Sequence, residues 1–495
     1  MKRAAARCRR PLVAAMLAIS VAGCPQTEDA GDIENAEASA PIEAPPAPSP
    51  VAPDEVPEPD MTDMETQVEE RLRERRSAVE ARPTSAETWG RYGMVLHAHE
   101  LWSEAEIAYR EAQRLAPDDV RWPYYLGDVL SVVGTDPQTS IHALRRAMAL
   151  RADYAPAHLR LGRALLAADR PDEAANELER ALELEADLQP ARVTLAQIEL
   201  ARGDLERSSK LLNDVLRAQP RHAQALSTLA QVYMRQGRRD EARAVARRTD
   251  DAAIYNLFSD PLMSKVVAEG VSSILLWERA KGQFDNGNFE QAALGLAQVA
   301  ALLPDDAAVH HQLAVAYQRQ GRLDGARASL ERAVAADGEQ VETRVLLGSL
   351  LIDQGQARPA IAHLERALGL APNDPDAGWL LARAQVEAGA PRAALASFDT
   401  AAARAKADGR AIPTWAHNVW GSALAQSGQT LAAADRFRAT LAEDPTNAQA
   451  LFYLGLLAEG EGRTDRAVEL YCRSMASQPN PPAAGRLSAL GRICR

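Results

Sequence analysis

The chain has 495 residues, of which 5% are aromatic, and a formal net charge of −12. It is too long for one compact hydrophobic core, so several domains or a repeat array are expected. Residues 1–24 hold five Lys and Arg and no acidic residue, whereas residues 25–70 hold fourteen Asp and Glu and no basic residue. The rest of the chain is therefore close to neutral, which gives no basis for nucleic-acid binding.

The first 23 residues are typical of an export signal. A basic start, MKRAAARCRR, is followed by an apolar run of 13 residues, PLVAAMLAISVAG. This run is too short to span a bilayer, which favours a signal peptide over an uncleaved membrane helix. The last three residues of the run and the cysteine after it form VAGC, which resembles the lipobox of bacterial lipoproteins. The resemblance implies lipidation of Cys24, and Pro25 in place of Asp favours the outer membrane, facing the periplasm. An orientation toward the cell exterior stays open.

A tether is predicted after the lipidated cysteine. Residues 24–64 are rich in proline and acidic residues and have almost no large apolar side chain, so they cannot bury enough surface to fold. A solvated linker is favoured over a specific binding role for its acidic residues. Residues 65–85 are predicted to form an N-terminal capping helix.

A period of 34 residues begins at Ala86. In its first unit, AETWGRYGMVLHAHELWSEAEIAYREAQRLAPDD, the residues Trp89, Gly93, Ala105 and Tyr109 occupy the marked positions of the tetratricopeptide repeat, which the unit resembles. The resemblance implies an all-α fold, a superhelix or α-solenoid of about eleven helix-turn-helix repeats. The later units start at residues 120, 155, 189, 223, 273, 307, 341, 375, 414 and 448.

Residue sizes within each unit agree with this interpretation. Small residues recur at positions 8 and 20, where two helices would approach closely, and larger ones such as Leu178 would fill the space beside them. Glycines at the turn suit a positive φ; they are Gly203, Gly237, Gly321, Gly355, Gly389 and Gly462.

The period is interrupted between residues 250 and 272, which separates block 1 (residues 86–249) from block 2 (residues 273–481). A structural joint is favoured over a functional loop, because its apolar residues should be buried. These residues are Ile254, Leu257, Phe258, Leu262 and Met263. A second interruption, residues 403–413, is predicted only to lengthen a helix and its connection.

Residues 482–495 are predicted to form a C-terminal capping helix, with Leu487, Leu490 and Ile493 on the face that covers the last repeat. In an exported protein Cys472 and Cys494 are a possible disulfide, which would pin this end of the chain; two separate thiols are the alternative. The nine histidines have no partners at metal-ligand spacing. No catalytic motif or cofactor-binding motif is recognised, so we expect neither an enzyme nor a cofactor.

The groove lined by the first helices is the candidate binding site. By the resemblance, positions 2, 5, 6, 9 and 12 of each repeat face it, and their aromatic, basic and amide side chains suit an extended peptide. The candidate groove residues are Tyr124, Arg160, Arg163, Gln197, Gln231, Trp277, Lys281, Trp379, Arg383 and Phe452.

The sequence thus predicts a membrane-anchored periplasmic lipoprotein that acts as a protein-protein interaction scaffold or assembly factor. Its expected partners are proteins or peptides and, through the lipid anchor, the membrane, without nucleic acid. Two alternatives stay open: a structural spacer of the envelope without a groove ligand, and an accessory subunit of an export or redox enzyme complex.

Overall fold

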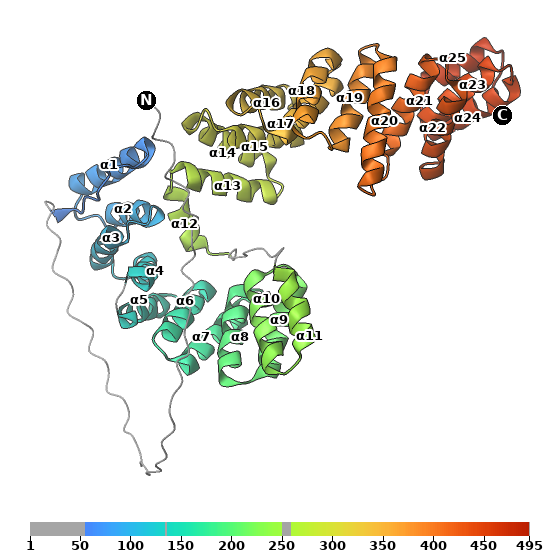
Figure 1. Ribbon diagram of the computed structural model, residues 1–495. Coiled ribbons are helices and arrows are strands. Elements are labelled where there is room, and N and C mark those ends of the chain that lie inside the picture. Colours follow the sequence, from blue (N-terminus) through green and yellow to red (C-terminus); the bar gives the residue numbers. More distant parts are fainter. Residues whose placement is uncertain (1–54, 134–135, 250–258, 495) are drawn as a thin grey trace. The chain divides into compact units, whose positions relative to one another are not determined.

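The computed structural model describes residues 55–133, 136–249 and 259–494 (Figure 1), and this part of the chain contains 25 α-helices and no strand. Block 1 consists of five antiparallel helix pairs. They are α2 (Ala86–Ala98) with α3 (Trp102–Leu115), α4 (Arg121–Val133) with α5 (Pro137–Leu150), α6 (Ala155–Ala167) with α7 (Pro171–Leu184), α8 (Gln189–Arg202) with α9 (Leu205–Ala218), and α10 (Ala223–Arg235) with α11 (Arg239–Ala246), which η2 (Arg247–Thr249) follows.

Block 2 consists of six such pairs. They are α13 (Ser273–Asp285) with α14 (Phe289–Leu302), α15 (Ala307–Arg319) with α16 (Leu323–Ala336), α17 (Val341–Asp353) with α18 (Ala357–Leu370), α19 (Pro375–Glu387) with α20 (Pro391–Ala407), α21 (Thr414–Gln426) with α22 (Thr430–Glu443), and α23 (Ala448–Gly460) with α24 (Thr464–Ser477). The prediction of about eleven repeats is confirmed. Helix α20 is 17 residues long, as the second interruption indicated.

Close helix contact explains the small residues at position 8. A Cβ atom added to Gly348 would lie 2.7 Å from Cγ of Leu364, and one added to Gly455 would lie 2.5 Å from Cε1 of Tyr471. These distances are shorter than van der Waals contact, so only glycine allows the two helices of such a repeat to pack this closely. The six glycines predicted at turns all have positive φ, between 71° and 86°.

Two helices flank the repeats and a third joins the blocks. Helix α1 (Thr66–Ala81) packs on α2, and α25 (Pro481–Ala489) packs on α24. The joint contains α12 (Pro261–Glu269), which packs against α2. Of the apolar residues expected to be buried in the joint, Leu262 is buried and Met263 is partly buried. The other three lie outside the described residues.

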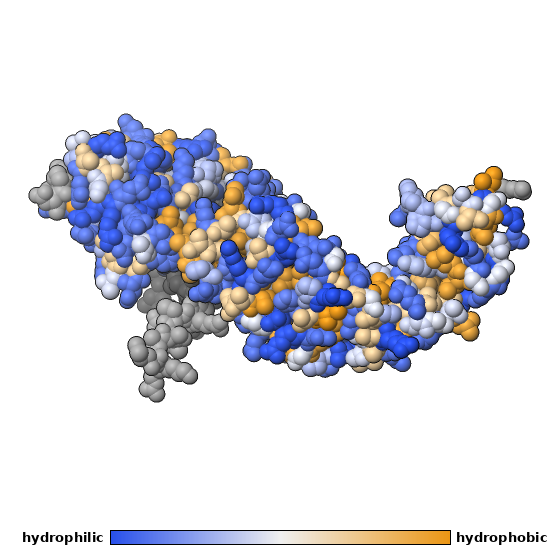
Figure 2. Space-filling view, turned by 90° about the horizontal axis from the view of Figure 1, so that it is seen from above, coloured by the Kyte–Doolittle hydropathy of each residue, from blue (hydrophilic) through white to orange (hydrophobic). Residues whose placement is uncertain are grey.

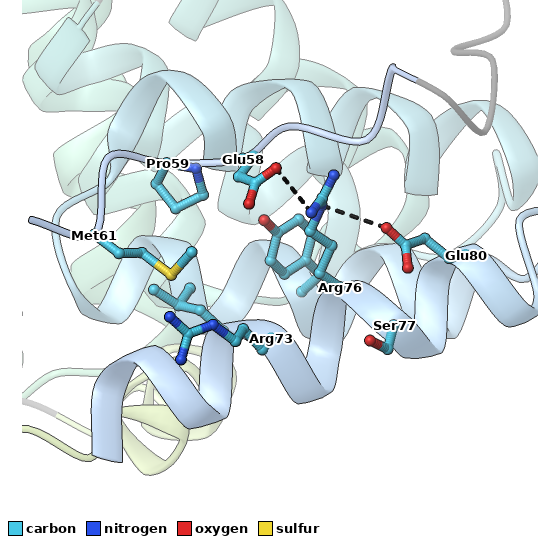
Figure 3. Close-up of a pocket in the computed structure, with 9 residues that line it drawn as sticks. Glu58, Pro59, Met61, Arg73, Arg76, Ser77 and Glu80 are labelled. Carbon is cyan, nitrogen blue, oxygen red and sulfur yellow. Dashed lines mark ion pairs between the residues drawn. The ribbon is translucent and has the colours of Figure 1, made fainter. Parts of the chain in front are cut away.

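The tether prediction was wrong for its last ten residues, 55–64. Val56 is buried, and the Tyr92 hydroxyl donates a hydrogen bond of 2.5 Å to the carbonyl of Pro57. Arg76 pairs with Glu58 at 2.9 Å and with Glu80 at 3.5 Å, closing one side of a small cleft between this segment and α1 (Figure 3). A few apolar side chains and one backbone carbonyl therefore suffice to hold a segment that is otherwise proline-rich and acidic.

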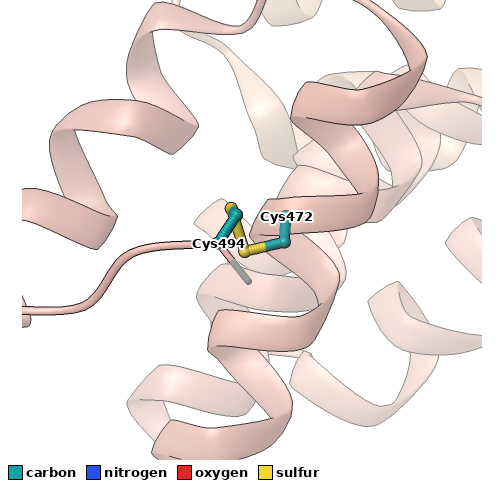
Figure 4. Close-up of a disulfide and its surroundings, with 2 residues drawn as sticks. All are labelled: Cys472 and Cys494. Carbon is teal, nitrogen blue, oxygen red and sulfur yellow. A yellow bond between two sulfur atoms is a disulfide. The ribbon is translucent and has the colours of Figure 1, made fainter.

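The C-terminal cap also differs from its prediction. Helix α25 ends at Ala489, so Cys494 lies beyond it; Leu487 is buried, whereas Ile493 is 82% exposed. The face expected to cover the last repeat is shorter because the chain leaves the helix at Leu490 and turns at Gly491, whose φ is positive. A disulfide joins Cys494 to Cys472 of α24 (Figure 4).

Candidate functional site: an occupied inner face in block 1

The carboxylate of Asp260 is held by side chains of block 1. The Tyr124 hydroxyl of α4 donates to its Oδ2 atom at 2.6 Å, and the Tyr154 hydroxyl, just before α6, donates to its Oδ1 atom at 2.7 Å. Arg160 of α6 donates to Oδ2 at 3.2 Å and to the Tyr124 hydroxyl oxygen at 2.7 Å. Both tyrosines and Asp260 are buried. Hydrogen bonds from three side chains offset the cost of burying this charge.

Asp260 also begins helix α12. Its Oδ1 atom accepts a hydrogen bond from the amide of Met263 at 3.0 Å, and Pro261 occupies the first helical position. Aspartate followed by proline is a typical helix start, because the side chain caps a free amide and proline has no amide to satisfy. One carboxylate thus starts the helix and binds it to block 1.

The first turn of α12 is bound through its backbone as well. The amide of Leu262 donates to the Tyr154 hydroxyl oxygen at 3.1 Å, and the Tyr125 hydroxyl of α4 donates to the Leu262 carbonyl at 2.9 Å. The side chains of Leu262 and Val266 belong to the same hydrophobic cluster as the cores of the first three repeats and part of the fourth.

A second polar group continues from this pocket to α2. Asp128 pairs with Arg160 and lies 3.1 Å from Nε2 of His97, whose Nδ1 lies 3.3 Å from the Tyr109 hydroxyl. Burial, together with the nearby Arg160 guanidinium, lowers the pKa of His97 to about 3. His97 is therefore neutral at neutral pH.

The end of α12 is tied to α1. Glu269 pairs with Arg71 and with Arg75, both at 3.1 Å. Just beyond α12, the amide and hydroxyl of Ser273 each donate to the carboxylate of Glu65 at 2.8 Å. The joint is therefore bound at its start to block 1, and its end is bound to the N-terminal capping helix α1 and to Glu65 just before it.

The predicted groove residues separate by their position in the repeat. Position 5 packs between repeats: Tyr124 and Trp379 are buried, and Trp277 and Phe452 are half-buried. Trp379 packs against Phe398 and Trp420, at centroid distances of 6.2 and 6.4 Å, and so is a core residue rather than a groove residue. The ring of Trp379 fills the space beside the next first helix, which removes it from the groove, whereas the Tyr124 hydroxyl contacts Asp260 as described above.

The residues at position 9 are more accessible to solvent than those at position 5. Arg163, Gln231 and Lys281 are exposed, whereas Gln197 is half-buried. Arg383, also half-buried, pairs with Asp353 and Glu387, each at 2.9 Å. Arg160, at position 6, is engaged by Asp260 and Asp128 as described above. The structure therefore brings Tyr124 and Arg160 together, whereas the other candidates are spread over several helices along the two blocks.

Sequence reasoning missed Asp260, Tyr125, Tyr154 and His97. The Asp-Pro pair at residues 260 and 261 is the signal that could have revealed α12 inside the joint. Nothing in the local sequence indicates that this helix returns to the inner face of block 1.

The described ranges contain no cluster of three or more His, Cys, Asp or Glu side chains arranged to hold a metal ion. No helix within them is long and apolar enough to cross a membrane. On the face seen in Figure 2, apolar residues gather in several patches between hydrophilic ones.

Profiles of the tetratricopeptide repeat match residues 134–190, 165–227, 199–253, 283–347, 351–412 and 418–484, together more than half of the chain. No curated protein sequence matches the chain. Solved structures with a similar fold include MamA (22% identity, 32% of this chain and 92% of that chain, TM-score 0.31) and Pseudomonas aeruginosa PilF (19%, 44% and 97%, TM-score 0.37). Another is YrrB, described as a TPR protein with an unusual peptide-binding site (20%, 36% and 91%, TM-score 0.32). The helix pairs, their spacing and the profile matches agree: this chain belongs to the tetratricopeptide repeat family.

Proposed function

We propose that this protein is a membrane-anchored scaffold that binds segments of other proteins on the inner faces of its two repeat blocks. Proteins of this family generally act as scaffolds that bind peptides or proteins rather than as enzymes. One observation carries the proposal: the inner face of block 1 already holds a helix, α12, through hydrogen bonds and buried apolar side chains. A surface that binds a helical segment of its own chain has the chemistry to bind one from a partner.

The accessible part of the inner face supports this function. On α6, Arg163 and Leu166 are exposed, and on α10 Gln231 and Met234 are exposed, Met234 by 55%. Peptide recognition uses such a mixture of basic, amide and apolar groups. The structural spacer is the second candidate, and it requires no partner on these residues.

Photo-crosslinking in intact cells distinguishes the scaffold from the spacer. A photoreactive amino acid at Gln231 or Lys281 should capture a specific protein, identified by mass spectrometry. The same probe at the exposed Asn213, on the second helix α9, serves as the control. Substitution Arg163→Glu should abolish capture from Gln231, because it reverses a charge on the same inner face. Equal capture from all positions, or none, would support the spacer.

Membrane attachment is the second part of the proposal and rests on the VAGC motif at residues 21–24. We expect Cys24 to incorporate labelled palmitate and the protein to sediment with outer membranes. The Cys24→Ala variant should lose the label and enter the soluble periplasmic fraction, because the acyl chains are its anchor. Retention of that variant in the membrane would contradict lipid anchoring at Cys24.

The identity of the partner captured by crosslinking would separate an assembly factor from an accessory subunit of an export or redox complex.

A further inference from the structure

We propose that the pocket formed by Tyr124, Tyr154 and Arg160 is a recognition site for partner helices that begin with Asp, Pro and a large aliphatic residue. In this proposal α12 is a tethered self-ligand, which a partner segment of the same chemistry displaces. The inference rests on the proposed scaffold function and names its partner class.

The first step is the selectivity of the pocket for aspartate. Each oxygen of the Asp260 carboxylate accepts a hydrogen bond from a tyrosine, at 2.6 and 2.7 Å, and Arg160 adds a charged donor at 3.2 Å. These three donors all belong to block 1, so a carboxylate from another segment could take the place of Asp260. An amide would bring its NH₂ group against one of the hydrogen-bond donors, so asparagine should bind much more weakly.

The second step is recognition of a helix start rather than of an extended peptide. The Tyr154 hydroxyl donates to Asp260 and accepts from the amide of Leu262, two residues later. The Tyr125 hydroxyl donates to the Leu262 carbonyl. These hydrogen bonds recognise backbone groups in the spacing of a helical first turn. The buried Leu262 side chain additionally requires a large apolar residue at this position.

The third step is that α12 can be exchanged. It has nine residues, and a helix of this length is unstable in water without the surface that it packs on. Much of its stability must therefore come from block 1, which would stabilise a partner helix in the same way. The side of α12 that carries Val267 adds little to its stability, because that side chain is 49% exposed.

The chain itself supplies a matched comparison. Asp374 and Pro375 begin α19 with the same pair of residues, and the Asp374 carboxylate caps the amides of Asp376 and Ala377. There the third residue is Asp376 instead of leucine. A peptide from this segment keeps the Asp-Pro helix start and lacks the aliphatic residue.

The test is direct binding of labelled peptides to the full-length chain, measured by fluorescence anisotropy. The probe is SDPLMSKVVAEGV, residues 259–271, and the control is NDPDAGWLLARAQ, residues 373–385. In the wild type, the tethered α12 competes at an effective concentration of about 1 mM, so the probe should bind only near that concentration. In the double variant D260A/L262A, which weakens the self-ligand, the probe should bind at least tenfold more tightly.

Three further arms decide the identity of the site. The control peptide, and the probe with Asp260→Asn, should bind at least tenfold more weakly than the probe. Adding Tyr154→Phe to the double variant should weaken probe binding at least fivefold, whereas adding Tyr453→Phe, in block 2, should leave it unchanged.

If the double variant loses its helical circular dichroism, the readout becomes hydrogen exchange of α12 in the wild type. Probe at several millimolar should then accelerate this exchange, and the control peptide should not.

Two outcomes would overturn the proposal. The first is a folded double variant that binds the probe no better than the wild type, or that binds both peptides equally. The second is a wild-type dimer that D260A/L262A dissociates, which would make the α12 of a second copy the occupant. Neither outcome affects crosslinking from Gln231 and Lys281, so failure of this inference is distinguishable from failure of the scaffold function.

Discussion

Glycine at position 8 shows how single residues determine the packing within a repeat. At Gly348, the side chain of the fully buried Leu364 occupies the space that a methyl group would need. At Gly282, within α13, no atom lies within 4 Å of an added Cβ. The two helical glycines therefore differ only in whether the space beside them is filled.

This difference makes a paired prediction. Gly348→Ala should lower the melting temperature, because overpacking costs about 1–3 kcal/mol and exceeds the gain in helix propensity. Gly282→Ala should raise the melting temperature, because the higher helix propensity of alanine adds about 1 kcal/mol of stability at most. Both variants are measured by differential scanning calorimetry. A stabilising Gly348→Ala would show that α17 and α18 do not pack as closely as described.

His97 makes the stability of block 1 depend on pH. Burial, with Arg160 nearby, lowers its pKa to about 3, while the unfolded chain has the ordinary value near 6.5. Between these values only the unfolded state binds the proton, so the contribution is complete above pH 6.5 and is lost as the pH falls. At pH 5 about 2 kcal/mol of the full contribution is lost.

We expect the melting temperature to fall less over this pH range in the His97→Gln variant than in the wild type. The comparison of the two slopes removes the effect of titrating groups away from this site, such as His158. Identical slopes would mean that His97 is charged or exposed in the folded protein.

At the scale of single elements, the positions of the repeat helices follow from the sequence and the docking of α12 does not. The 34-residue period predicted the first residue of ten of the eleven first helices, because the period is local: each repeat buries its apolar face against the next. Asp260 instead contacts Tyr124, 136 residues earlier. No periodic pattern specifies such a contact.

The candidate site was predicted only in part, because a local sequence pattern does not specify the contacts between repeats. The first-helix pattern identifies which residues point away from the paired second helix, but it does not separate the open groove from the contact between consecutive repeats. Trp379 and Arg383 lie four residues apart on α19, yet Trp379 is buried in the core and Arg383 is half-buried. Ring size decides this: an aromatic side chain gains more by filling the space between repeats than by facing solvent.

The C-terminal element depends on its disulfide. Ile493 is exposed, so the segment after α25 has few apolar contacts, and it is tied to α24 by Cys494. The bridge spans 22 residues, for which loop closure predicts about 3 kcal/mol of stabilisation. In Cys494→Ser, hydrogen exchange of α25 should accelerate while that of α19 stays constant, because solenoid contacts are local. Unchanged exchange of α25 would assign its stability to the buried Leu487 and to the ion pair between Arg486 of α25 and Glu459 of α23 instead.

At the scale of the whole molecule, stability should vary along the chain, because a solenoid has no single core. One hydrophobic cluster combines α1 to α8 with α12 and contains the buried rings of Trp89, Tyr109, Trp122 and Tyr125. At the other end of block 1, α11 has eight residues, and only Ala242 and Val245 of them are buried. The joint thus reinforces the first repeats of block 1 and leaves its last repeat with a small contact surface.

Native-state hydrogen exchange should show this gradient. We expect amides of α2, α4 and α6 to exchange most slowly and those of α10 and α11 most rapidly within block 1, since local opening costs least where little apolar surface is buried. In D260A/L262A, exchange of α2 and α4 should accelerate toward the rate of α10, whereas α21 and α23 of block 2 should not respond. Uniform exchange along block 1 would mean that its five repeats open as one cooperative unit and that α12 contributes no local reinforcement.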